Sequence, residues 1–131
     1  MAICVRSMEP DLLQLAKDAQ ASAAVPDLQT LKAYVPIAQA HASFKAGQYQ
    51  AAMTEANGAL AIEPKFAPAY WAMGVSAGML GQWDQAVTNL QSSVKIDKNY
   101  NNGKAALKWA QDGQKAAKNG QSPKDKPPVW E

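Results

Sequence analysis

The stretch GQYQAAMTEANGALAIEP, from Gly47 to Pro64, is nearly repeated 34 residues later as GQWDQAVTNLQSSVKIDK, from Gly81 to Lys98. The two stretches align without a gap, and apolar or small residues recur at the same places in both. The aligned pairs are Gly47 and Gly81, Tyr49 and Trp83, Ala52 and Ala86, Leu60 and Val94, Ile62 and Ile96, and Glu63 and Asp97. A fixed period of this length, filled by two helices, predicts a stack of helix pairs.

Glycine and proline mark the ends of the expected helices. Gly47 and Gly81 suit the left-handed position that often follows a helix. Pro36 removes one helical hydrogen bond and clashes with the preceding turn, so the chain is expected to kink or break near Tyr34 and Val35. The helices expected from the apolar spacing cover about residues 36–46, 48–62, 68–80, 83–96 and 102–118.

Two terminal segments flank the repeated part. Residues 1–32 are expected to form an N-terminal helical segment, because Leu12, Leu15 and Ala19 recur at helical spacing. Residues 119–131, NGQSPKDKPPVWE, are rich in proline, lysine and polar residues and are expected to form a flexible C-terminal tail. Removing residues 121–131 is therefore expected to leave the stability nearly unchanged.

The second unit, AYWAMGVSAGMLGQWDQAVTNLQSSVKID at residues 69–97, resembles the tetratricopeptide repeat (TPR) family. The resemblance rests on Gly74, Gly81, Trp83, Ala86 and the closing pair Ile96–Asp97. It extends over residues 33–118 and implies an all-α, TPR-like helical-hairpin solenoid. The implied parts are two repeats (33–66 and 67–100), the N-terminal helix, and a C-terminal capping helix (102–118). The first unit departs from the family at Pro36, and the second has Lys98 where the family usually has a closing proline.

Small residues stand where two antiparallel helices must approach closely. Ala40 and Ala52 take these places in the first unit, and Gly74 and Ala86 take them in the second. A bulky side chain there would overpack the contact, so Gly74→Leu is expected to destabilise the fold.

Composition argues against several classes of function. The chain has 131 residues and a net charge of +2, and it shows no basic stripe interleaved with aromatic residues, so nucleic-acid binding is not expected. With one cysteine (Cys4) and one histidine (His41), neither a cysteine-based nor a multi-histidine metal site is expected. No phosphate-binding loop, nucleophile elbow or paired-carboxylate spacing appears, so a non-catalytic protein without a cofactor is expected. No signal peptide or transmembrane run is evident, which makes a cytoplasmic protein the default and membrane binding unexpected.

The resemblance also implies a concave groove, lined by the first helix of each pair. The side chains in its columns are Tyr34, Ile37, His41, Phe44, Trp71, Val75, Met79 and Trp109. Some family members clamp a peptide carboxylate with lysine and asparagine, but Ile37, His41 and Trp71 occupy those columns here. The resemblance therefore implies a protein–protein interaction scaffold that binds a peptide or helix of an unidentified partner in an apolar groove.

Three occupants of this groove remain open at the level of sequence. The N-terminal helix could fold back and complete the core, since aromatic stripes at helical spacing are often core. A peptide or amphipathic helix of another protein could bind there, because exposed apolar patches mark interaction sites. A second copy could bind through the same face, which would make the chain a self-associating module. A related alternative is that the chain is a fragment of a longer TPR array. In that case its own N-terminal helix fills the groove in place of a missing repeat.

Overall fold

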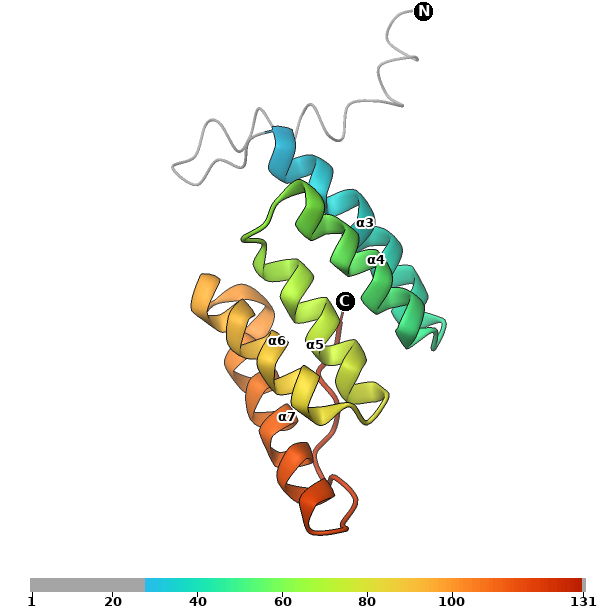
Figure 1. Cartoon of the computed structure of the whole chain (residues 1–131), viewed down its shortest axis with the longest axis vertical. Coiled ribbons are helices and arrows are strands. Elements are labelled where there is room, and N and C mark those ends of the chain that lie inside the picture. The colour runs from blue at the N-terminus through green and yellow to red at the C-terminus, as the bar shows by residue number, and fades with distance from the viewer. Residues whose placement is uncertain (1–27, 131) are drawn as a thin grey trace, which may run out of the picture.

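The computed structural model describes residues 28–130, which contain helices and no strand (Figure 1). The helices are α3 (Leu28–Lys45), α4 (Tyr49–Ile62), α5 (Ala67–Met79), α6 (Trp83–Ile96) and α7 (Gly103–Lys118), with a short 3₁₀ turn η1 (Tyr100–Asn102) before α7. The all-α prediction is confirmed for this part of the chain. Of the N-terminal helical segment expected over residues 1–32, residues 1–27 lie outside the described part of the chain and residues 28–32 form the start of α3.

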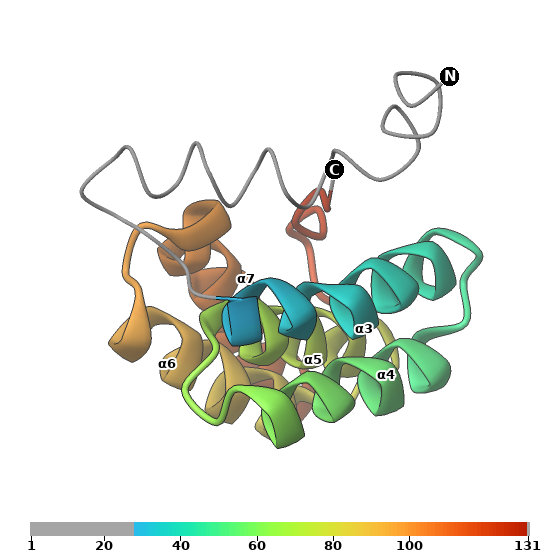
Figure 2. The same cartoon turned by 90° about the horizontal axis from the view of Figure 1, so that it is seen from above.

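Each helix packs against the next one along the chain, and α5 also contacts α3 and α7. Figure 1 shows the hairpin of α3 and α4 beside the hairpin of α5 and α6, with α7 packed on the far side of α6. In Figure 2 the last residues of the chain rise on the side of α3, away from α4. The helices α3 and α5, which open the two hairpins, therefore border the surface that the chain end approaches.

The two hairpins turn in the same way. Gly47 and Gly81 follow their first helices with φ values of +79° and +77°, a conformation that glycine adopts without strain. Gln48 and Gln82 then have φ and ψ of −94° and 72°, and of −87° and 70°. The backbone N–H of each glutamine donates a hydrogen bond to the backbone carbonyl five residues earlier. This bond ends the helix in a Schellman motif. The repeat in the sequence is thus also a repeat in backbone geometry.

The first helix continues through Pro36, so of the predicted kink or break the break does not occur. Ala33, Ile37 and Ala40 lie three and four residues apart on both sides of the proline, and all three are buried. Because this apolar stripe packs against α4 and α5, burial holds the two halves of the helix in one element despite the missing hydrogen bond.

The close contact expected at the small residues is present. Ala40 and Ala52 are fully buried. A Cβ atom added to Gly74 would lie 2.6 Å from the Leu90 Cγ and 3.1 Å from the Ala86 carbonyl oxygen. Helices α5 and α6 therefore meet at a distance that only glycine permits at position 74.

None of the helices within residues 28–130 combines the length and the hydrophobicity that crossing a membrane requires.

Candidate functional site

The candidate site forms where the C-terminal tail, residues 119–130, folds back onto the helices. The tail leaves the end of α7 and returns beside it (Figure 1). Midway, Asp125 lies next to Asp112 of α7, and a hydrogen bond between the two carboxyl groups raises the pKa of Asp125. At the end of this path Trp130 is only 7% exposed and belongs to the hydrophobic core.

Three side chains from two helices hold Trp130, and we call them the Trp130 site: His41 and Phe44 of α3, and Trp71 of α5. The His41 ring stacks on the Trp130 indole, with centroids 4.8 Å apart and planes inclined by 28°. Phe44 and Trp71 each meet the indole edge to face at 5.4 Å. His41 Nε2 also lies 3.0 Å from the backbone carbonyl oxygen of Trp130, which accepts a hydrogen bond from it. The indole is therefore packed on three sides, and its main chain is anchored once.

The composition of the tail predicts a flexible segment, and in the structure the end of this segment is packed. Residues 119–127 are exposed and Val129 is 71% exposed, as the polar composition suggests. Trp130 alone buries a large apolar surface, and one buried aromatic side chain is enough to fix a short segment locally. The average composition of the tail does not reveal this single anchor.

The structure brings together only part of the predicted groove. His41, Phe44 and Trp71 converge on Trp130, as described. Ile37 and Val75 are buried in the core, so they support the site from beneath and offer almost no surface for contact.

The remaining predicted groove residues lie away from the Trp130 site. Tyr34 is 42% exposed, and its ring meets Phe66 edge to face at 4.8 Å. Met79 is half-buried and packs against the core. Trp109 is buried, with its ring 5.0 Å from that of Trp83.

Trp109 nevertheless takes part in a shallow hollow of about 310 Å³ along the tail. This hollow is bordered by α7 and the residues just before it on one side and by the tail on the other. Its lining residues are Asn101, Asn102, Ala105, Ala106, Trp109, Lys126, Pro128 and Val129. The tail thus follows one face of α7 before it reaches the Trp130 site.

Neither Trp130 nor Tyr100 was among the groove residues predicted from the sequence. Tyr100 meets the Trp71 ring edge to face at 6.3 Å, and burial raises its pKa to about 12. The only signal for Trp130 was the apolar end of the tail, PPVW at residues 127–130, which interrupts a polar segment.

One buried polar group at the site lacks a partner. Trp71 is fully buried, and its indole Nε1 donates no hydrogen bond to any of residues 28–130. A buried donor without an acceptor carries a desolvation cost of about 1–3 kcal/mol. The tail therefore fills the apolar part of the site without satisfying this donor.

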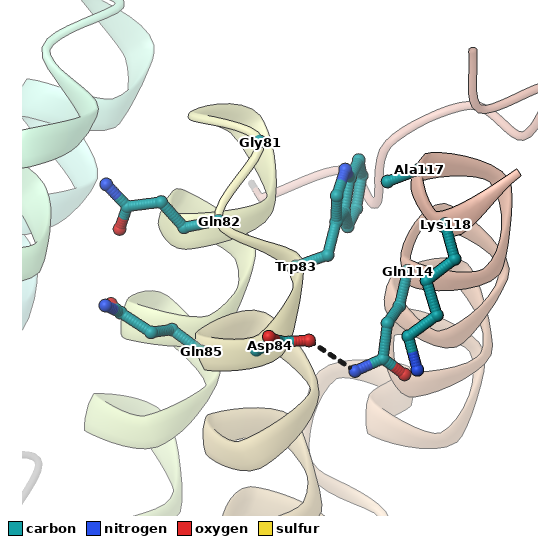
Figure 3. A pocket seen from close by; sticks show the side chains of 8 residues that line it. All are labelled: Gly81, Gln82, Trp83, Asp84, Gln85, Gln114, Ala117 and Lys118. Atoms are coloured by element: carbon teal, nitrogen blue, oxygen red, sulfur yellow. Dashed lines mark hydrogen bonds between the residues drawn. The ribbon is translucent and has the colours of Figure 1, made fainter. Parts of the chain in front are cut away.

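A second hollow, of about 430 Å³, lies at the opposite end of α7, beside the turn between α5 and α6 (Figure 3). Gln114 Nε2 donates a 2.7 Å hydrogen bond to the Asp84 carboxylate there. The Trp83 ring stands between α6 and α7, near Ala117. None of the predicted groove residues lines this hollow, and no group of three potential metal ligands occurs within residues 28–130.

Comparison with models of known families, with curated proteins and with solved structures gave no match. What the protein does must therefore be inferred from its own residues and contacts.

Proposed function

We propose that this chain is a non-catalytic, TPR-like binding module whose concave face binds an extended peptide of another protein. The 34-residue repeat in sequence and the matching turns at Gly47 and Gly81 support the TPR-like part of the proposal. The close helix contact at Gly74 supports it as well, because such stacks need small residues at this place.

The burial of Trp130 against His41, Phe44 and Trp71 is the observation that carries the binding role. This surface already accommodates a non-helical segment through one aromatic anchor and one main-chain hydrogen bond. Peptide recognition commonly combines a pocket for a side chain with contacts to the main chain. A peptide of a partner can use the same features.

Self-association is the second candidate, and the same observation favours it. The tail of a second copy has the chemistry that the Trp130 site accepts in its own chain. Exchange of an identical segment between protomers is a low-cost route to a dimer.

The test is to pan a random-peptide display library on the full chain carrying Trp130→Ala, which vacates the site. Selected peptides should bind this variant and lose most of their affinity when His41→Ala is added. Gln39→Ala is the matched control, because Gln39 is an exposed position of the same helix. Fluorescence anisotropy with synthetic copies of the peptides measures the Kd values.

Two results would contradict the proposal. One is a library that yields no peptide with measurable affinity for the folded variant. The other is a set of peptides that bind equally well after His41→Ala, since these would use a different surface.

A further inference from the structure

We propose that the tail is an exchangeable internal ligand, and that the partner is an extended, proline-containing peptide with a tryptophan anchor that must displace it. This inference rests on the proposed function and specifies the ligand and its competitor. The bound tail shows what such a partner would look like: Lys126, Pro128 and Val129 border the hollow beside α7 without helical structure, and Trp130 enters the site.

The contacts that hold the tail do not depend on its covalent attachment. Three of them are ring contacts to the indole, from His41, Phe44 and Trp71. The fourth is the hydrogen bond from His41 to the Trp130 carbonyl oxygen, which every peptide backbone offers. Any extended peptide that places a tryptophan in this register makes the same four contacts.

The attachment of the tail is also limited to a short region. Residues 119–127 are exposed, Pro128 is half-buried, and Val129 is 71% exposed. Release of the tail therefore needs the withdrawal of Trp130 and the loss of the exposed contact between Asp125 and Asp112, and no unfolding of α3 or α5. The short linker adds to these contacts an effective concentration of the order of 1 mM.

The unpartnered Trp71 Nε1 indicates how a partner can outcompete the tail. This donor belongs to a ring that packs against the Trp130 indole, and it is buried with no acceptor within the described chain. A peptide that presents a carbonyl or hydroxyl oxygen to it gains a hydrogen bond that the tail does not make. The partner is therefore expected to carry an additional acceptor close to its tryptophan.

The experiment uses the synthetic peptide SPKDKPPVWE, residues 122–131, labelled with fluorescein, and measures its Kd for the full chain by anisotropy. An internal competitor weakens binding by a factor of one plus the ratio of its effective concentration to its Kd. For a peptide with a Kd of about 0.1 mM, wild type should bind roughly tenfold more weakly than Trp130→Ala. The same peptide with tryptophan replaced by alanine should not bind either protein.

A second measurement uses wild type, in case Trp130→Ala does not fold. With 5-fluorotryptophan in the protein, the ¹⁹F resonance of Trp130, assigned with Trp130→Phe, should move to its solvent-exposed position as unlabelled peptide is added. The other three tryptophan resonances should stay dispersed. A Trp130 resonance that does not change at saturating peptide would overturn the proposal.

Other outcomes separate this inference from the proposed function. Equal affinity of the peptide for wild type and Trp130→Ala would overturn the internal competition. Library peptides that lack tryptophan but bind in a His41-dependent way would overturn the inference and keep the proposed function. A wild-type mass of two chains at sedimentation equilibrium, reduced to one by Trp130→Ala, would show that the tail belongs in a second copy and would also overturn it.

Discussion

At the scale of single residues, glycine positions in this fold differ sharply in what surrounds them. A Cβ atom at Gly74 would come within 2.6 Å of Leu90, whereas a Cβ atom at Gly58 of α4 would meet nothing within 4 Å. Both lie inside helices, so backbone propensity favours alanine at both places. The difference between the two sites therefore isolates the effect of packing.

Gly74→Ala is expected to lower the free energy of unfolding by about 1–3 kcal/mol, because the methyl group forces Leu90 and the α6 backbone apart. Gly58→Ala, the matched control, is expected to raise the free energy of unfolding by about 0.5–1 kcal/mol, because alanine reduces the conformational entropy of the unfolded chain. Urea denaturation of both variants measures the difference. Equal stabilities would mean that α5 and α6 do not meet at position 74.

Tyr100 should make the stability depend on alkaline pH. Its pKa is raised from 10.0 to about 12, first by burial and then by the neighbouring Tyr34. The folded chain thus binds this proton more tightly than the unfolded chain, and its contribution to stability is lost as pH rises from 10 towards 12. Tyr100→Phe should therefore lose less stability than wild type over that interval in urea titrations. Parallel pH profiles for the two proteins would be inconsistent with the raised pKa.

At the scale of elements, most helices could be predicted from the sequence, because their ends carry local signals. The expected helices at 48–62 and 83–96 match α4 and α6 within a residue, and the glycines at 47 and 81 end the preceding helices as anticipated. The break predicted at Pro36 does not occur in α3. It was predicted from local backbone sterics alone, whereas burial against other helices decides the structure there. The stripe of Ala33, Ile37 and Ala40 outweighs the missing hydrogen bond.

Pro36→Ala should consequently stabilise the protein, by about 1 kcal/mol or more, because it restores a helical donor in the middle of α3. Pro68 provides the contrast: it lies in the first turn of α5, where a backbone donor has no helical partner. Pro68→Ala should bring no gain. Thermal unfolding of both variants tests the pair, and a destabilised Pro36→Ala protein would show that the proline shapes the packing of α3.

At the scale of the whole molecule, the tail completes the surface that α3 and α5 leave between them. The TPR resemblance implied His41, Phe44 and Trp71 as groove residues, and in the structure all three contact Trp130. Their occupant could not be predicted, because a contact between residues 41 and 130 has no local sequence signal. The composition of the tail as a whole favours flexibility, whereas its one large aromatic residue is buried against the helices.

Trp130→Ala is expected to lower the free energy of unfolding by about 1–3 kcal/mol, since it exposes the apolar faces of Phe44 and Trp71. Removal of residues 121–131 should cost a similar amount, contrary to the expectation from sequence. Val129→Ala is the control, because Val129 is 71% exposed, and it should stay within about 0.5 kcal/mol of wild type. A truncated chain as stable as wild type would indicate that Trp130 contributes nothing to the fold.

All four tryptophans of the chain occur in two edge-to-face pairs. Trp71 and Trp130 have centroids 5.4 Å apart, and Trp83 and Trp109 have centroids 5.0 Å apart. Indoles at such separations couple their electronic transitions, so each pair should produce an exciton couplet in the circular dichroism spectrum. Only the first pair spans the helices and the tail. The protein therefore carries an intrinsic optical signal for the position of its tail, together with a second couplet from a pair that contains no tail residue.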